Sequence, residues 1–492
     1  MAFFSPFRGG VHPDSFKELS ATLPIMRLPI PPQLFVPLRQ HAGSDAVAIV
    51  EPGSHVLKGQ LIARAGNGLS APVHAPTSGI VAAITPVTAA HPSGMKSNAI
   101  IIKPDRKDTP VKVPTLLDPF KLPRDELAQK IADAGIVGMG GASFPAAVKL
   151  SSAIDRHVET IVINGSECEP YLTADDRLMT ERAEKIILGA RLIRHVVGAQ
   201  KIAIAIEDNK PNAISAMQKA AVGEQQLEIV VVPTRYPMGS AKQMIKAVTG
   251  HEVPAGGRSS DVGVLMHNVA TAYAIAEALA ESKPLTSRIV TVSGGAIVRP
   301  QNVEALIGTP ARYLIEFCGG TVNTPTRLLL GGPMMGHVVQ SLDVPLIKGV
   351  AGILALTDHE ITNPQASPCI RCGRCVSACP MGLVPLEMAN RSKHGDFDGA
   401  NDYGLSDCIL CGSCAYVCPS HIPLVHYFQY AKGHLNSQTA QSKRMQYTRQ
   451  LAETRQERID KAAAAKAAAK AAKANRRKRS PAKTEKSPQG ES

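Results

Sequence analysis

Residues Cys369–Pro380 read CIRCGRCVSACP, and residues Cys408–Pro419 read CILCGSCAYVCP. Both stretches follow the pattern C-x2-C-x2-C-x3-C-P, which is the bacterial run that binds [4Fe–4S] clusters. The first three cysteines of a run bind one cluster, and the fourth reaches the other cluster. We therefore predict one cluster on Cys369, Cys372, Cys375 and Cys418, and a second on Cys379, Cys408, Cys411 and Cys414.

Two zinc sites or a set of disulfides are the alternatives for these eight cysteines. Structural zinc usually takes two separated cysteine pairs rather than four closely spaced cysteines twice over. The prolines that follow each run have no N–H to leave unpaired and turn the chain away from the cluster. The pattern therefore favours a two-cluster, ferredoxin-type domain over residues 360–425, which transfers single electrons.

Composition limits the class of protein. The chain has 492 residues, no Trp and a net charge of +13, and this length predicts three or four domains. Residues 451–492 hold twelve Lys or Arg and five Asp or Glu, so the basic character lies mostly in the tail. Nothing indicates nucleic-acid binding. The sequence shows neither a secretory signal nor an apolar run long enough to span a membrane, so we expect a chain that folds in the cytosol.

Changes in composition and in the spacing of apolar residues divide the chain into five parts. We predict a multidomain α/β and α+β protein: a β-rich hairpin domain of the barrel-sandwich kind, an α/β domain that binds flavin and nucleotide, a small β-grasp-like α+β insert, the two-cluster domain, and an Ala/Lys-rich tail. Their ranges are 1–125, 126–284, 285–345, 360–425 and 431–492. For the tail we expect a solvated helix that frays into a disordered basic end; attraction to anionic lipid is the alternative.

The β-rich part contains Val50–Ile84, where short apolar runs alternate with turn residues. This stretch resembles the hammerhead hairpin of lipoyl and biotinyl carrier domains, but His74 stands where those carriers have a modifiable lysine. We predict His74 to be a turn residue rather than a metal ligand, because no second ligand flanks it.

Helical and strand patterns alternate after residue 126, which predicts a largely parallel sheet. Helices are expected over Pro123–Gly138 and near Val303–Cys318, and short buried strands over Thr160–Gly165 and Lys201–Asp208. The other two cysteines, Cys168 and Cys318, have no ligand neighbours and are predicted to be buried thiols.

Two loops of the α/β part carry functional-looking residues. Gly138–Leu150 reads GMGGASFPAAVKL, and its glycines would let backbone approach a ligand next to a helix N-terminus. Taken alone, this loop could equally be a tight turn. Asn164–Arg177 then places four carboxylates after a predicted strand, at the edge where open α/β sheets bind ligands.

These loops resemble those of the flavin-bearing, NADH-oxidising subunit of respiratory complex I. GMGGASFPAAVK is similar to its G-R-G-G-A-G-F-P-T-G-x-K loop, NGSECEP to N-A-D-E-S-E-P, and HNVAT (His267–Thr271) to N-N-V-E-T. Together with the hairpin domain in front and the two clusters behind, residues 1–425 resemble the C subunit of the Rnf, or Rsx, electron-transport complex.

The resemblance implies FMN as a cofactor and NAD(H) as a substrate. It places Gly138, Gly140 and Lys149 at the FMN phosphate and ribityl chain. It places Asn164, Glu167 and Asn268 along the flavin, Phe144 near the nicotinamide nucleotide, and Glu169 at its ribose. The chain departs from the complex I pattern at positions that bear on the nucleotide more than on the flavin: Ser143, Ala146, Ala147, Ser166 and Ala270.

The resemblance also implies a peripheral subunit on the cytoplasmic face of the bacterial inner membrane. Electrons would pass between NADH and a low-potential carrier, such as ferredoxin or another redox protein, through FMN and the clusters. Integral membrane partner proteins would couple this transfer to ion movement. The alternatives are a soluble flavin/iron–sulfur NADH-dependent reductase of the cobalamin-reductase kind, and a non-catalytic electron-wire and docking subunit. No catalytic acid–base residue is expected.

Overall fold

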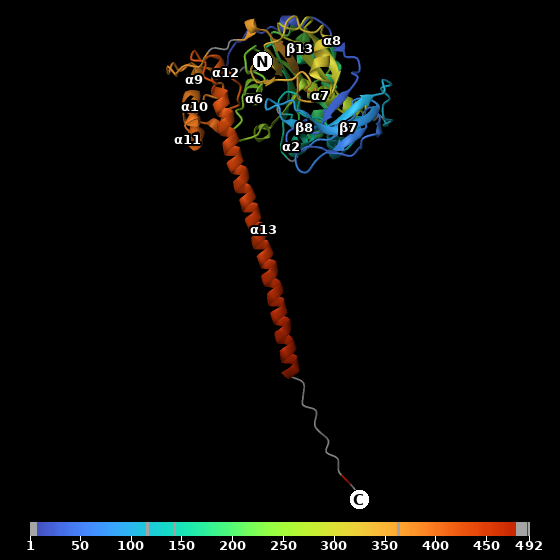
Figure 1. Cartoon of the computed structure of the whole chain (residues 1–492), viewed down its shortest axis with the longest axis vertical. Helices are drawn as coiled ribbons and strands as arrows, with labels where there is room; N and C mark the ends of the chain where they lie inside the picture. The colour runs from blue at the N-terminus through green and yellow to red at the C-terminus, as the bar shows by residue number, and fades with distance from the viewer. Residues whose placement is uncertain are drawn as a thin grey trace.

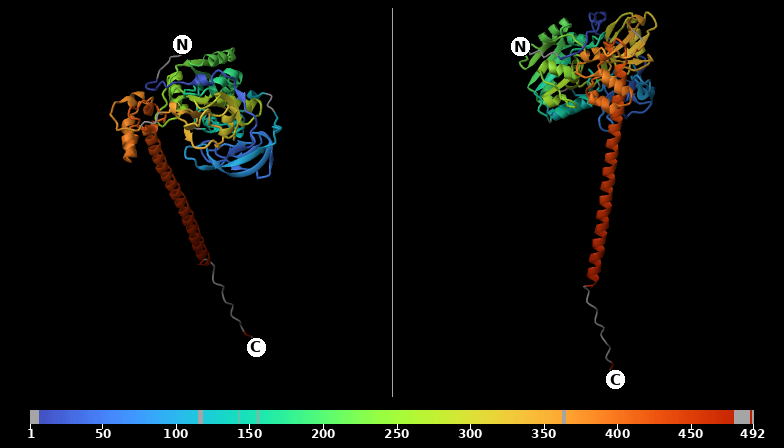
Figure 2. Two further views of the ribbon diagram at one scale, coloured as in Figure 1. Left: turned by 45° about the horizontal axis from the view of Figure 1, so that its top comes forward. Right: turned by 90° about the vertical axis from the view of Figure 1, so that its left-hand side faces the viewer.

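The computed structural model describes residues 7–478, except 115–117, 142, 155 and 362–364, together with residue 490. Four compact parts follow one another along the chain, and a long helix leaves the last of them (Figure 1). The β-rich part lies on one side of the α/β part and the cysteine-rich part on the other (Figure 2). The predicted multidomain α/β class is confirmed at this level.

The β-rich part consists of two antiparallel sheets around one apolar core. Buried side chains such as Leu34, Val56, Ile62 and Ile100 fill this core. One sheet has the order β2-β8-β7-β4 and the other β3-β5-β6. The strands are β2 (Leu34–Pro37), β3 (Val47–Ala48), β4 (His55–Val56), β5 (Leu61–Arg64), β6 (Val73–His74), β7 (Gly79–Thr88) and β8 (Lys96–Pro104).

The prediction that His74 is a turn residue is wrong. His74 lies in strand β6, opposite Leu61, and is buried. Burial, with a smaller contribution from the nearby Lys348 ammonium, lowers the pKa of His74 to about 3. The ring therefore stays neutral at physiological pH and acts as part of the core.

A parallel sheet forms the centre of the α/β part, as the alternation of helix and strand predicts. Its order is β11-β10-β9-β12, and all three pairings are parallel. Helices cover both faces, so the strands are nearly continuous apolar runs. The strands are β9 (Thr160–Gly165), β10 (Lys201–Glu207), β11 (Leu227–Val232) and β12 (Val264–Asn268).

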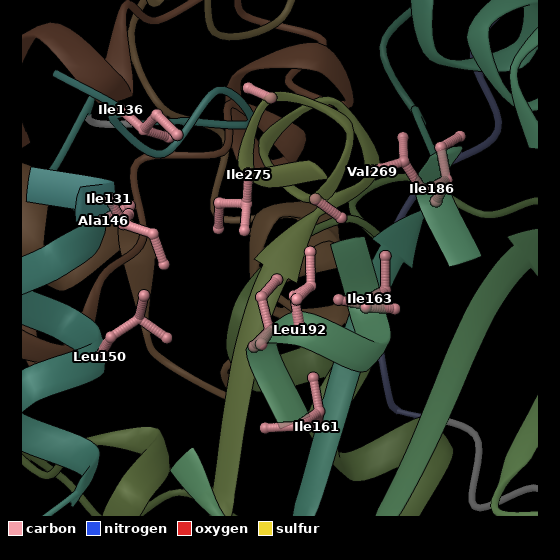
Figure 3. Close-up of a cluster of buried hydrophobic side chains, with 14 of the residues drawn as sticks. Ile131, Ile136, Ala146, Leu150, Ile161, Ile163, Ile186, Leu192, Val269 and Ile275 are labelled. Atoms are coloured by element: carbon pink, nitrogen blue, oxygen red, sulfur yellow. The ribbon is translucent and has the colours of Figure 1, made fainter. Parts of the chain in front are cut away.

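The side chains of these strands divide between two cores. Ile161 and Ile163 of β9 point into the larger core with side chains of six helices, of which Figure 3 shows a part. Val162 points to the other face, where α6 packs. Gly189 of α4 lies against the Ala272 backbone of α7, where any side chain would overlap it. The helices are α1 (Arg124–Asp133), α2 (Ala146–Ile154), α3 (Ala174–Glu181), α4 (Ala183–Val197), α5 (Pro211–Ala220), α6 (Ala241–Thr249) and α7 (Val269–Ala280), with 3-10 turns η2 (Pro119–Lys121) and η3 (Ser259–Val262).

The third part is a mixed six-stranded sheet with the order β1-β14-β13-β17-β15-β16. Two of its strands, β1 and β17, come from outside the predicted range 285–345. β1 follows a short 3-10 turn, η1 (Lys17–Leu19), near the N-terminus. The elements are β1 (Met26–Arg27), β13 (Ser287–Ser293), β14 (Gln301–Leu306), α8 (Ala311–Phe317), β15 (Arg327–Leu330), β16 (His337–Val339) and β17 (Gly352–Leu356).

The helix predicted near Val303–Cys318 is wrong in its first half. Gln301–Leu306 is strand β14, in which Val303 and Ala305 are buried and Glu304 between them is only half-buried. This period of two is the strand signal. Helix α8 begins only after Pro310, which stands at its N-cap.

Short helices around the two cysteine runs make up the fourth part, and α13 leaves it as a single rod (Figure 1). Leu424, Phe428 and Ala431 of α13 are buried in this part, whereas every residue from 441 to 476 is exposed. At 1.5 Å per residue, the 55 residues of α13 span about 82 Å. None of the helices described is long and apolar enough to cross a membrane. The elements are η4 (Asp358–Glu360), α9 (Arg374–Ala378), α10 (Pro385–Lys393), α11 (Phe397–Asp402), η5 (Leu405–Asp407), α12 (Ser413–Tyr416) and α13 (Leu424–Lys478).

Candidate functional site: a sheet edge beside the cysteine runs

The carboxyl ends of β9 and β12 bring two predicted site residues to one sheet edge. Asn268 caps α7 by accepting the Ala270 N–H at 2.8 Å, and its amide nitrogen donates to Asp175 at 2.6 Å. Asn164 donates to the Gly239 carbonyl at 2.9 Å. Both amides are therefore fixed by the backbone or by a charged neighbour, so they can present groups in set directions.

The glycine-rich loop crosses the same edge. A side chain at Gly140 would come within 2.9 Å of the Asn268 Cβ, so the loop can lie this close only with glycine there. Gly138 donates its N–H to the Phe144 carbonyl at 2.8 Å, which closes the loop. The Phe144 ring itself is 40% exposed and is free to contact a ligand from outside.

Lys149 lies on α2, behind the loop. Its ammonium donates to the Met266 carbonyl of β12. Burial lowers the pKa of Lys149 to about 8. The buried His267 ring, whose Nε2 has no partner among the residues described, lies close enough to feel this charge.

The acidic loop between β9 and α3 has its own structural role. The Glu167 carboxylate accepts the N–H groups of Asp175 and Asp176, at 2.8 and 3.1 Å, and so caps α3. Burial, and then repulsion from Glu167, raises the pKa of Asp175 to about 7 and that of Asp176 to about 6. Several carboxylates share one partly buried edge, and this arrangement is typical of functional sites.

Glu169 is held by the third part of the chain. Its carboxylate accepts the N–H groups of Met334 and Met335, both at 2.9 Å. A side chain at Gly332 would overlap the Glu169 carboxylate, so this approach also requires glycine. Burial raises the pKa of Glu169 to about 7. Glu169 thus joins the acidic loop to the β15–β16 turn.

Two charged features of the edge were not predicted. Glu207 and Lys210, both fully buried, form an ion pair of 2.9 Å at the end of β10. Arg288 donates from Nη2 to the Met139 carbonyl of the glycine-rich loop at 2.8 Å, while its buried Nη1 has no partner among the residues described. An unpaired guanidinium nitrogen at a glycine-rich loop fits an anionic ligand such as the phosphate of FMN.

The cysteines predicted to share the second cluster lie around one apolar cavity. The other walls of this cavity include Met381, Leu383 and Phe428. Among the residues described, no three His, Cys, Asp or Glu side chains converge closely enough to bind a single metal ion. A cubane is larger than one ion and takes one thiolate at each corner, so a cavity ringed by cysteines fits it. The four cysteines are Cys379, Cys408, Cys411 and Cys414.

The other cysteine set lies at the surface. Cys369 and Cys372 are exposed, and Cys375 and Cys418 are intermediate. No disulfide joins any of the ten cysteines. Of the two outside the runs, Cys318 is buried as predicted. Cys168 is only half-buried and accepts the Gly239 N–H at 3.4 Å.

Tyr236 connects the sheet edge with the cysteine-rich part. Its buried hydroxyl donates to the Cys411 carbonyl at 2.6 Å. The same apolar cluster contains Cys168 and Met334, which border the acidic loop. A ligand-binding sheet edge placed directly beside a two-cluster domain defines a flavin/iron–sulfur electron-transfer protein.

Family models match four parts of the chain, and the matches agree with this class. They are the Nuo51 FMN-binding domain over residues 131–277, the RnfC barrel sandwich hybrid domain over 5–107, the SLBB domain over 289–338 and the 4Fe-4S dicluster domain over 368–422. FMN and two iron–sulfur clusters are therefore the cofactors of this class of chain.

Curated relatives cover most of the chain. The C subunit of the ion-translocating oxidoreductase complex of Rhodobacter capsulatus is 50% identical over 431 residues, which is 87% of this chain and 83% of that one. The corresponding protein of Yersinia pestis is 44% identical over 455 residues, 92% of this chain and 73% of that one. This chain belongs to the family of C subunits of ion-translocating oxidoreductase complexes. Among solved structures, an NAD+-reducing [NiFe]-hydrogenase in the H2-reduced state aligns at 17% identity with a TM-score of 0.46, covering 66% of this chain and 68% of that chain.

Proposed function

We propose that this chain is the electron-transfer subunit that exchanges electrons between NADH and a low-potential carrier for a membrane complex. The carrier would be ferredoxin or another redox protein, and integral membrane partner proteins would couple the transfer to ion movement. The chain would lie peripherally on the cytoplasmic face of the bacterial inner membrane. The observation that carries this proposal is the contact between the sheet edge and the Cys411 peptide, through Tyr236.

FMN, when bound, would exchange two electrons with the nicotinamide and one at a time with the clusters. The chain's own residues would bind and orient the groups. Gly138, Gly140, Lys149 and Arg288 surround the place proposed for the phosphate end. Asn164, Glu167 and Asn268 would line the flavin ring, because all three lie at the carboxyl edge of the sheet.

The nicotinamide nucleotide would enter from the solvent side. Phe144 is exposed there and can stack on a planar ring. Glu169, proposed to bind the ribose, already accepts two N–H groups, at Met334 and Met335. A carboxylate has about four acceptor sites, so it can accept ribose hydroxyls while it keeps both N–H partners.

The two clusters would act in a fixed order. Cys411, one of the four cysteines that line the cavity, accepts the Tyr236 hydroxyl of the α/β part at its carbonyl, so a cluster there would exchange electrons with the flavin. Cys369 and Cys372 are exposed, so the cluster that they would share with Cys375 and Cys418 is the one that would face a partner protein.

Anaerobic titration of the cluster-reconstituted chain with NADH tests this function. We expect FMN to co-purify and the visible absorbance of the clusters to bleach as NADH is added. Reduction of the bound flavin without bleaching of the clusters would contradict electron transfer from FMN to the clusters. A chain that binds no flavin and ignores NADH would instead be an electron-wire and docking subunit.

Fractionation of cells separates the membrane-complex function from that of a soluble reductase. We expect the chain in the membrane fraction at low salt, together with integral membrane partners. Recovery in the soluble fraction alone, with NADH-dependent reduction of a corrinoid, would favour the cobalamin-reductase alternative.

A further inference from the structure

The N-terminal segment Phe7–Ser20 is not part of the β-rich domain that follows it. At one end, Gly10 donates its N–H to the Ala378 carbonyl at 2.9 Å. A side chain at the neighbouring Gly9 would come within 2.5 Å of the Cys379 carbonyl, so the segment fits tightly against this cysteine peptide. At the other end, Ser20 hydrogen-bonds Thr173 at 2.7 Å. The segment therefore runs from the second cysteine set to the acidic loop.

Lys17 is the centre of the contact with the acidic loop. Its ammonium donates to the carbonyl oxygens of Glu167 and Glu169 at 2.9 Å, and to that of Leu172 at 2.5 Å. An ammonium has three N–H donors and no acceptor, so these three carbonyls satisfy it completely. The backbone of the loop surrounds one cation, while the carboxylates of Glu167 and Glu169 accept N–H groups of α3 and of the β15–β16 turn.

The conformation of the loop explains why a cation is needed. Glu167 and Tyr171 both have positive φ, 50° and 65°, which is uncommon for residues other than glycine. Three carbonyls that converge on one point also repel one another unless a donor stands between them. The Phe16 ring stacks on Tyr171 with 4.7 Å between centroids and adds a second contact from the same segment.

We propose that Lys17 is a positioning residue of the flavin site: it holds the loop Glu167–Leu172 in the conformation that presents Glu167 and Glu169. The inference rests on the proposed function of this loop in binding FMN and NADH. It assigns a role to the N-terminal segment. The partner that Lys17 recognises is the backbone of the chain itself.

The test compares Lys17→Met with Lys17→Arg and the unchanged chain, each purified at full length with clusters reconstituted. Methionine keeps the length of the side chain but has no donor. We expect Lys17→Met to bind FMN at least about tenfold more weakly, because charged hydrogen bonds to the loop are lost. KM for NADH should rise more than kcat falls. Lys17→Arg should recover part of the affinity, since a guanidinium still donates to carbonyls but with a planar geometry.

A matched control in the same segment separates positioning from simple packing. Ser20→Ala removes the buried hydrogen bond to Thr173 and leaves the ammonium in place. We expect this variant to unfold more easily but to bind FMN with unchanged affinity. Equal losses of affinity in Ser20→Ala and Lys17→Met would contradict a specific role of the ammonium.

Hydrogen exchange of the flavin-free chain tests the role of Lys17 independently of the proposed function. In Lys17→Met, amides from 168 to 176 should exchange at least about tenfold faster than in the unchanged chain, while those of β9 stay protected. If the unchanged chain binds no FMN, the proposed function fails, yet this measurement still tests Lys17. Unchanged exchange in the loop, or unchanged FMN affinity in a chain that binds FMN, would overturn the inference.

Discussion

Replacing Lys210 with methionine should strongly destabilise the α/β part. The Lys210 ammonium lies 2.9 Å from the Glu207 carboxylate, and both side chains are fully buried. Among the residues described, Glu207 would then keep a single donor to its carboxylate, the Ser166 hydroxyl at 3.1 Å. Breaking a buried ion pair from one side costs about 3–5 kcal/mol, because the remaining charge has lost its partner.

The pH dependence of this loss has a definite sign. Burial raises the pKa of Glu207, and Lys210 is the group that most opposes this rise. Without Lys210 the folded-state pKa would lie further above the unfolded value. The loss of stability is then complete at high pH and becomes smaller as the pH falls toward the pKa of Glu207 in the unfolded chain, because a protonated carboxyl buries no charge. Lys210→Met should therefore recover stability as the solution becomes more acidic.

Hydrogen exchange at the amides of β10 is the suitable assay, because a chain of several domains does not unfold in two states. Two variants serve as controls. Lys201→Met makes the same change at an exposed lysine of the same strand, 68% exposed, and should cost less than about 1 kcal/mol. The double variant Glu207→Gln/Lys210→Met removes both charges and should lose only about 1–2 kcal/mol. A loss below about 1 kcal/mol for Lys210→Met, with no change between pH 5 and 8, would refute the reasoning.

Three further predictions concern other parts of the chain. Tyr236→Phe removes the donor to the Cys411 carbonyl and should lower the local stability at this contact by about 1–3 kcal/mol, measured by hydrogen exchange at the amides around Cys411 in the cluster-loaded chain. Burial raises the pKa of Glu169 to about 7. As the pH rises from about 4.5 to 7, the unchanged chain should therefore lose stability relative to Glu169→Gln, which denaturation curves recorded at several pH values would show. An equal pH dependence of the two proteins would contradict this. Replacing three exposed lysines of α13 with glutamate, at Lys466, Lys470 and Lys473, should change the stability of the compact parts by less than about 0.5 kcal/mol. A larger change would mean that this stretch packs against another surface.

The parts of the fold that could be predicted are those with a local sequence pattern. Each cysteine run places its ligands within twelve residues, and each strand of the parallel sheet is a short apolar run flanked by helical periodicity. Cys379, Cys408, Cys411 and Cys414 line one cavity, and the spacing of the runs predicts that they share a cluster. These signals depend only on neighbours in the chain.

The residues that sequence reasoning missed come from distant segments. Lys17 meets a loop 150 or more residues away, and Arg288 meets the glycine-rich loop 149 residues away. Neither has a local pattern, because a single lysine or arginine is usually a solvated surface residue. Glu207 and Lys210 are three residues apart, yet their burial follows from packing between β10 and α5, and no periodicity of charges reveals it.

The contacts of the N-terminal segment also constrain the order in which the chain can fold. Gly10 hydrogen-bonds to Ala378, so this segment waits during translation for a partner 368 positions later in the chain. At 5–20 residues per second this delay lasts roughly 20–75 s. During that time the α/β sheet can form from its own, closer contacts, but the segment stays unanchored at its cysteine end. The beginning of the chain is therefore among the last parts to reach its final place, and it can do so only when the first cysteine run has emerged.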